Sequence, residues 1–156
     1  MEEALDGLPL KKDSLILDAG CGTGLLFSYA TGIAKLIVGA DMSAGVLMEA
    51  KDKAKQYFNV ALFRVDTDHM PFSNHVFDAV FAVTLLQNVP DPQQTLFEMK
   101  RVSKNDGFIV ATGLKKTFSR DEFGKLLRKA GLKILVMKED NLQKEHIAFC
   151  TKQRTS

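Results

Sequence analysis

The chain has 156 residues, of which 46% are apolar and 26% are charged, and its formal net charge is +2. A chain of this length fits one domain that buries roughly two-thirds of its unfolded surface, so its core needs no disulfide or metal. No apolar run reaches about 18 residues, the N-terminus lacks a signal-peptide pattern, and two cysteines are too few for a disulfide framework. We therefore expect one cytoplasmic domain over residues 1–156, without a membrane span and with a minimal leader at about residues 1–14.

Apolar runs and helical patterns alternate along the chain. Short apolar runs predict strands at residues 15–17, 36–40, 60–65, 77–84 and 108–112. Helical spacing predicts helices at 25–31, after Ser43 with an apolar stripe that extends to Phe58, at 91–103 and at 119–130. Capping patterns support the last two helices, because Asp91 precedes Pro92 and Ser119 lies three residues before Glu122. Between them, Asn105-Asp106-Gly107 predicts a turn into the strand at 108–112.

This order predicts an α/β fold, namely a doubly wound, mostly parallel sheet with helices on both faces. Two further strands, at 132–137 and 146–151, are joined by a link too short for a crossover helix. They should be antiparallel to each other and add an antiparallel C-terminal edge strand. Ligands of such sheets bind beyond the carboxyl ends of the strands. The residues at those ends, which we expect to line one site, are Asp18, Asp41, Asp66 and Thr84.

A glycine-rich loop follows the first predicted strand, because residues 17–24 read Leu-Asp-Ala-Gly-Cys-Gly-Thr-Gly. Gly20, Gly22 and Gly24 let the backbone turn tightly and approach a ligand. A dinucleotide fingerprint needs a glycine where Leu25 stands, and a phosphate-binding P-loop needs a lysine that this loop lacks. The loop therefore favours a ligand other than a nucleoside triphosphate or NAD.

Asp41 lies at the end of the second predicted strand, 21 residues after Gly20. An acidic residue there is placed to accept hydrogen bonds from both hydroxyls of a ribose, and it would repel a 2′-phosphate. We therefore expect a nucleoside ligand that lacks this phosphate.

Further motifs follow the glycine loop in order, and together they cover residues 15–112. They are Asp41-Met42-Ser43, Asp66 with Met70-Pro71-Phe72, Phe77-Asp78-Ala79-Val80, Val89-Pro90-Asp91-Pro92, Glu98, Arg101-Val102 and Gly107. With these motifs the sequence resembles the class I S-adenosylmethionine-dependent methyltransferases, a seven-strand, Rossmann-like family, and within it the small-molecule type. The resemblance implies S-adenosyl-L-methionine as cofactor and S-adenosyl-L-homocysteine as product.

The resemblance also implies how the methionyl part of the cofactor would be held. Gly20, Cys21, Gly22 and Gly24 would pass beneath it, and Asp18 would lie near its amino group.

The nucleoside part would be held by the ends of the next two strands. Asp41 would bind the ribose hydroxyls, and Met42 would cover one face of the adenine. Asp66 would accept a hydrogen bond from the adenine amino group, and Thr67 would supply a backbone contact.

After the fourth strand, Thr84 and Leu85 would lie near the sulfonium and the other adenine face. Many relatives carry a His-His pair here, whereas this chain has Gln87-Asn88, which removes a ready general base. We therefore assign no catalytic residue and take Gln87 and Asn88, with Thr84, as acceptor-side candidates. No pair of His or Cys has metal-ligand spacing, so we expect no metal site.

The expected activity is methyl transfer by in-line displacement to an unidentified small-molecule acceptor, for which the protein positions the acceptor and excludes water. The alternative is a cofactor-binding protein of the same fold that serves as a partner or regulator without turnover. An NAD-dependent oxidoreductase is a third hypothesis, which Leu25 and the motif at Asp66 disfavour.

The acceptor side should be sparsely covered, because few residues precede the first strand and the link at 113–118 is short. The site would then be open, be covered by a second subunit in a homo-oligomer, or lack an N-terminal piece. The apolar leader residues would either dock such a partner or pin the leader to its own sheet; they are Leu5, Leu8, Pro9 and Leu10.

Charge is unevenly distributed. Residues 1–110 carry 10 basic and 14 acidic residues, whereas residues 111–156 carry 11 and 5. The basic part either meets an anionic partner or simply faces water. We find no nucleic-acid signature in it, because basic and aromatic residues are not interleaved.

Overall fold

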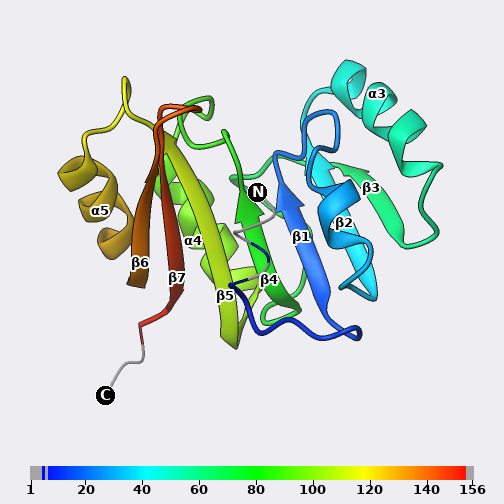
Figure 1. Ribbon diagram of the computed structural model, residues 1–156, viewed down its shortest axis with the longest axis horizontal. Coiled ribbons are helices and arrows are strands. Elements are labelled where there is room, and N and C mark those ends of the chain that lie inside the picture. The colour runs from blue at the N-terminus through cyan, green and yellow to red at the C-terminus, as the bar shows by residue number, and fades with distance from the viewer. Residues whose placement is uncertain (1–4, 6, 154–156) are drawn as a thin grey trace.

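A seven-stranded sheet forms the centre of the computed structural model, which describes residues 5 and 7–153 (Figure 1). Its strands lie in the order β3-β2-β1-β4-β5-β7-β6. Their bounds are β1 Leu15–Ala19, β2 Leu36–Asp41, β3 Val60–Arg64, β4 Phe77–Ala82, β5 Ser103–Leu114, β6 Leu132–Asp140 and β7 Glu145–Lys152. β1 to β5 are parallel, and β7 is antiparallel to both β5 and β6. The predicted mostly parallel sheet with an antiparallel C-terminal pair is confirmed, with β7 inserted between β5 and the edge strand β6.

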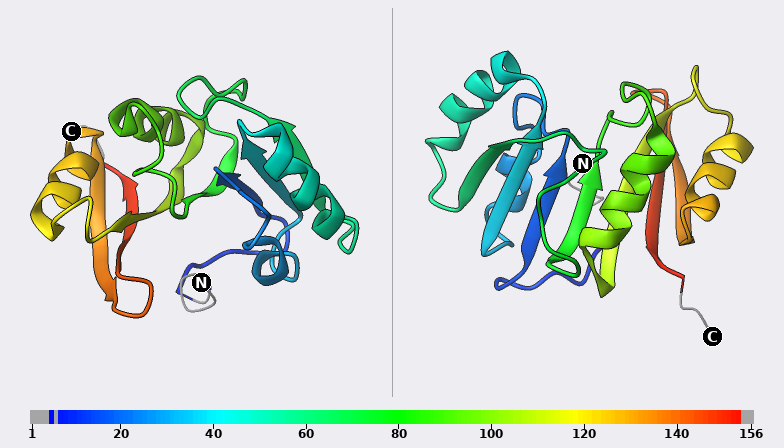
Figure 2. Two further views of the ribbon diagram at one scale, coloured as in Figure 1. Left: turned by 90° about the horizontal axis from the view of Figure 1, so that it is seen from above. Right: turned by 180° about the vertical axis from the view of Figure 1, so that it is seen from behind.

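The helices cover both faces of this sheet, as predicted. They are α2 Phe27–Ala30, α3 Ala44–Ala54, α4 Pro92–Val102 and α5 Arg120–Lys129. Successive strand residues point to opposite faces, so Ile16 packs in one core cluster with Phe27 of α2 and Ala50 of α3. Leu17 packs in the other cluster with Leu96 of α4, which also includes residues of α5. Seen from behind, α4 lies against β4 and β5 (Figure 2).

Local capping explains where the longer helices begin. Ser43 accepts a hydrogen bond from the backbone N–H of Val46, which starts α3. Asp91 accepts a hydrogen bond from the backbone N–H of Gln94 at the start of α4. Ser119 and Glu122 form a reciprocal capping box at the start of α5. These caps satisfy backbone donors that a helix cannot pair internally. The predicted starts of α4 and α5 are confirmed.

Two predicted helix boundaries are wrong. The helix at 25–31 shrinks to α2, because residues 20–26 are taken up by turns of the glycine loop. The stripe after Ser43 does not reach Phe58, which is 97% exposed, because α3 ends at Ala54. The chain is instead held at Asn59, whose buried amide donates to the carbonyls of Thr31 and Ala34.

The predicted turn at residues 105–107 is also wrong, because β5 already begins at Ser103. Its register against β4 shifts between Phe77 and Ala79, so the extra residues form an irregularity inside the strand. A bulge of this kind keeps a strand paired while it absorbs unmatched residues.

The leader residues pack on their own domain. Leu5 is buried, and Leu8 and Leu10 are partly buried against the core cluster of α2 and α3. For Leu5, Leu8 and Leu10 the structure therefore favours pinning to their own domain, whereas Pro9 is exposed. Within residues 5 and 7–153, no helix is both long and apolar enough to cross a membrane.

Candidate functional site

A cavity of about 770 Å³ opens beyond the carboxyl ends of β1, β2, β3 and β4. Ten of the eleven residues predicted for the cofactor line it, and so does Asn88. The residues that share this wall are Asp18, Gly20, Cys21, Gly22, Asp41, Met42, Asp66, Thr67, Thr84 and Leu85. Gly24 and Gln87 do not line it. Residues from four strand ends, far apart in sequence, thus meet in one place.

The three loop glycines all have positive φ, at +71°, +55° and +80° for Gly20, Gly22 and Gly24. A side chain at Gly20 would collide with Leu85, and one at Gly24 would collide with the ring of Phe27. At Gly22, apart from the glycine itself and its two chain neighbours, no residue has an atom within 4 Å of the place a Cβ would occupy. Gly22 therefore leaves open space in the cavity, whereas Gly24 is required by packing behind it.

Asp41 fastens this loop to the end of β2. One carboxylate oxygen accepts the backbone N–H of Gly22 at 3.0 Å, and the other accepts that of Ser43 at 2.9 Å. A carboxylate has about four acceptor sites, so two remain for hydroxyls of a ligand. Asp41 is thus both a structural residue of the loop and an open acceptor in the cavity.

Asp18 is the buried acid of the cavity, with 3% of its surface exposed. Burial, and to a smaller extent the neighbouring carboxylate of Asp41, raise its pKa to about 7. Two acidic groups that disfavour each other's charge make a place where a cation is stabilised. The inner end of the cavity therefore suits an amino group or another cationic group.

Asp66 follows β3 and is half exposed, with its side chain 53% accessible. One of its oxygens accepts the backbone N–H of Asp68 at 3.0 Å, which shapes the turn that also buries Thr67. Nδ1 of His69 lies 3.4 Å from the other oxygen. Asp66 therefore presents a carboxylate to the outer part of the cavity.

The loop beyond Asp66 is held by an ion pair on α4. Glu98 accepts the backbone N–H of Met70 at 2.7 Å, and Arg101 bridges back to Glu98. Arg101 also donates to the carbonyls of Met70 and Phe72. This pair fixes the Met70-Pro71-Phe72 motif, so Glu98 and Arg101 act on the site only through the loop.

Thr84, two residues after β4, has a positive φ of +55°. Its backbone N–H donates to the hydroxyl of Thr112 at 2.8 Å, and its own hydroxyl donates to Glu145 Oε1 at 3.0 Å. Asn88 donates to the Thr84 carbonyl at 2.7 Å. Three hydrogen bonds therefore fix Thr84, whereas the side-chain amide of Gln87 is buried without a hydrogen-bond partner among the described residues.

Several residues of the site were missed by sequence reasoning. An apolar wall comes from the two residues after the glycine loop and from the segment after β4, namely Leu25, Leu26, Val83, Val89 and Pro90. Arg64, the last residue of β3, lines the cavity and donates a hydrogen bond to the carbonyl of Met42 at 2.9 Å. Glu145 has no local signal, since it reaches Thr84 across 61 positions of sequence.

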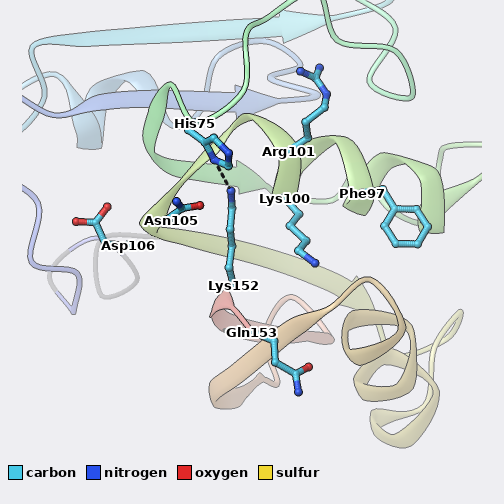
Figure 3. Close-up of a pocket in the computed structure, with 8 residues that line it drawn as sticks. All are labelled: His75, Phe97, Lys100, Arg101, Asn105, Asp106, Lys152 and Gln153. Atoms are coloured by element: carbon cyan, nitrogen blue, oxygen red, sulfur yellow. Dashed lines mark hydrogen bonds between the residues drawn. The ribbon is translucent and has the colours of Figure 1, made fainter. Parts of the chain in front are cut away.

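A second cavity, of about 700 Å³, lies between the end of α4, the start of β5 and the end of β7 (Figure 3). Its wall is basic, with Lys100, Arg101, Lys152 and His75 against Asp106. Lys152 Nζ lies 2.9 Å from His75 Nδ1, and burial together with Lys100 lowers the pKa of Lys152. A cationic ligand is therefore disfavoured here, unlike at Asp18. In the described residues, no three His, Cys, Asp or Glu side chains are grouped to hold a metal.

The family model described as a methyltransferase domain matches residues 17–111. Because this is more than half of the chain, the chain belongs to this methyltransferase family. The matched segment contains every motif from β1 to β5 that contributes to the cavity.

Individual relatives agree with this assignment. The demethylmenaquinone methyltransferase of Staphylococcus saprophyticus is 38% identical over 104 residues, which are 65% of this chain and 45% of that protein. The enzyme of the same name from Staphylococcus carnosus is 33% identical over 112 residues, or 70% of this chain and 46% of that protein. The chain thus spans just under half the length of these curated relatives.

Solved structures show the same fold at low identity. An S-adenosylmethionine-dependent methyltransferase from Aquifex aeolicus has a TM-score of 0.85 at 20% identity, covering 96% of this chain and 87% of its own. The methyltransferase bound to the Trm112 methyltransferase activator from Haloferax volcanii has a TM-score of 0.86 at 16% identity, with coverages of 98% and 88%. At these identities the likeness establishes the fold alone.

Proposed function

We propose that this protein transfers a methyl group from S-adenosylmethionine to a small-molecule acceptor by in-line displacement. The observation that carries the proposal is the joint placement of Asp18, Gly22 and Asp41 in one cavity. Asp18 suits a cationic amino group, Gly22 leaves the space that a ligand needs, and Asp41 keeps free acceptor sites for ribose hydroxyls.

The residues present fit the cofactor along its whole length. Met42 is exposed at the cavity wall and would cover the adenine, while Asp66 would accept a hydrogen bond from the adenine amino group. When bound, S-adenosylmethionine supplies an already activated methyl group on a sulfonium. The task left to the chain is to orient the acceptor and exclude water.

The acceptor is proposed to be small and mainly apolar. The wall next to Thr84 is built from apolar side chains, including Val83, Val89 and Pro90. The name of the Staphylococcus saprophyticus relative describes a methyl transfer to demethylmenaquinone, which supports a small-molecule acceptor for this chain as well.

Ligand binding tests the first half of the proposal. Thermal unfolding is followed with S-adenosylmethionine, S-adenosylhomocysteine and NAD, since a ligand at 100 times its Kd adds about 2.7 kcal/mol to stability. We expect the first two to stabilise the protein and NAD to have no effect. Stabilisation by NAD alone would refute the proposal. Transfer of a labelled methyl group to a panel of small apolar acceptors then tests turnover.

A second candidate function is cofactor binding without turnover, as a partner or regulator. The buried amide of Gln87 favours it, because this side chain offers no group to the acceptor side of the cavity. Tight binding of S-adenosylhomocysteine combined with no methyl transfer to any acceptor in the panel would select this function. Independently of turnover, we propose that the protein is cytoplasmic and forms a homo-oligomer. Sedimentation of the purified chain tests the oligomeric state.

A further inference from the structure

The hydrogen bond between Thr84 and Glu145 joins two features that each cost free energy. Thr84 is a β-branched residue with φ at +55°, a conformation that such residues rarely adopt. Glu145 is an acid with only 7% of its surface exposed. Strained backbone and buried charge are retained mainly where function requires them.

Glu145 lies at the start of β7, opposite Leu114 of β5 and Asp140 of β6. None of the ion pairs formed by residues 5 and 7–153 includes it. Burying an unpaired carboxylate is unfavourable unless hydrogen bonds compensate. Stability of the fold alone therefore gives no reason for an acid at this position, where an apolar residue would pack at lower cost.

The direction of the hydrogen bond decides what Thr84 can offer to a ligand. A carboxylate only accepts hydrogen bonds, so the single hydroxyl proton of Thr84 is committed to Glu145. Both lone pairs of Thr84 Oγ1 then remain for a donor. Because Thr84 lines the cavity and Glu145 does not, the hydroxyl is the group of this pair that a ligand can reach.

We propose that Glu145 is a positioning residue that makes Thr84 an acceptor for an O–H or N–H group of the methyl acceptor. The inference rests on the proposed function and names its substrate class, an apolar molecule with one donor group, such as a phenol. The Thr84–Glu145 pair also supplies the proton acceptor that Gln87 and Asn88 do not provide.

The proton and electron balance of the step is complete. The carbon–sulfur bond of the methyl donor breaks with its electron pair left on sulfur, and a lone pair of the acceptor oxygen or nitrogen forms the new bond to carbon. The acceptor proton moves to Thr84 Oγ1, and the hydroxyl proton of Thr84 moves to Glu145 Oε1. The positive charge of the sulfonium and the negative charge of Glu145 are both removed.

The test compares two probes that share one ring system, 1-naphthol and its methyl ether 1-methoxynaphthalene. Binding of each is titrated to the whole chain, with and without saturating S-adenosylhomocysteine. We expect the wild type to prefer 1-naphthol by about tenfold, the value of one good hydrogen bond. If Glu145 had only a structural role, its substitution would leave the ratio of the two affinities unchanged, because a looser cavity weakens the binding of both probes alike.

Four variants test whether the preference for 1-naphthol over its methyl ether depends on Thr84 and Glu145. Thr84→Val should abolish the preference, and Glu145→Gln should lower it because the amide NH2 can donate to Thr84 Oγ1 and occupy the lone pair that the ligand needs. Thr84→Ser should keep the preference because it keeps the hydroxyl. Glu139→Gln is the matched control, since this exposed acid pairs with Lys115 outside the cavity, and it should keep the preference. Affinity for S-adenosylhomocysteine should stay within about twofold of the wild type in Glu145→Gln and Glu139→Gln, because neither side chain lines the cavity.

A wild type without preference, or a folded Glu145→Gln that keeps it, overturns the inference. If Glu145→Gln does not fold, Thr84→Val decides, because retention of the preference there also overturns the inference. A failure of the proposed function looks different: S-adenosylhomocysteine would not bind, while the preference for 1-naphthol would persist without it.

Discussion

The two halves of the cavity are built by different kinds of contact. On the side of β1 to β3, Asp41 binds Gly22 and Ser43, which are 19 and 2 positions away in sequence. On the side of β4, β5 and β7, Thr84 binds Thr112 and Glu145, which are 28 and 61 positions away. The first half is therefore encoded in compact motifs, whereas the second depends on how the last strand inserts into the sheet.

The largest test of this comparison is Gly22→Val. The substitution places a β-branched side chain at φ +55° and into open space of the cavity. We expect the free energy of unfolding to fall by about 1–3 kcal/mol from strain and binding of S-adenosylhomocysteine to become undetectable by calorimetry. Gly131→Val is the control, because Gly131 has a φ of +75° outside the cavity, where only the flexible end of Lys100 approaches. Equal affinities in both variants would show that the loop does not hold the cofactor.

Asp41→Ala should have the next largest effect. Loss of the charged acceptor should weaken S-adenosylhomocysteine binding by about 2–3 kcal/mol. The two backbone amides that Asp41 satisfies also lose their partner, so the melting temperature should fall as well. Asp52→Ala, at an exposed acid on α3, is the matched control and should change neither quantity. Unchanged affinity in a folded Asp41→Ala protein contradicts the assignment.

The same contrast explains how far sequence reasoning reached. Capping at Asp91 and Ser119 and the strand ends at Asp18 and Asp41 follow from neighbouring residues, and these predictions agree with the fold. The irregular start of β5 was missed, because a bulge is decided by pairing with β4 rather than by the turn-like residues themselves.

Long-range contacts account for the missed part of the site. The acid at Glu145 reads as an ordinary exposed residue next to a turn, since its partner Thr84 is known only once β7 lies beside β5. Likewise, the position of Gln87 beside Asn88 does not reveal which amide faces the cavity. The backbone turn after β4 directs Asn88 to the cavity wall and buries the amide of Gln87.

The dependence of stability and of cofactor affinity on pH should also distinguish the two halves of the cavity, because Asp18 lies in the half built by β1 to β3. The pKa of Asp18 is raised to about 7 by burial and by Asp41. Between its ordinary value of 3.8 and 7, the native state holds a proton that the unfolded chain has released, so the free energy of unfolding should fall as pH rises through this window. A cationic amino group on the ligand favours the carboxylate. Affinity for S-adenosylhomocysteine should therefore rise with pH, by at most about tenfold per pH unit for one proton.

Asp18→Asn is the variant that isolates this titration. An amide does not ionise, so the pH dependence of both stability and affinity in this window should flatten, whereas Glu145→Gln should leave the affinity profile as in the wild type. Calorimetry between pH 5 and pH 8 measures both. A slope of affinity that persists in Asp18→Asn assigns the proton to another group.

The smallest expected effect concerns Met42 at the outer wall of the cofactor half. Its side chain is 60% exposed and its carbonyl is held by Arg64, so truncation should leave the fold unchanged. Thioether contacts with an aromatic ring contribute about 0.3–1.5 kcal/mol, and Met42→Ala should therefore weaken S-adenosylhomocysteine about two- to tenfold. Met48→Ala is the matched control, because Met48 is 71% exposed on α3 and does not line this cavity. If Met42→Ala weakens adenosine, which lacks the methionyl part, by the same factor, the lost contact is with the nucleoside; full retention of adenosine affinity would place Met42 elsewhere on the ligand.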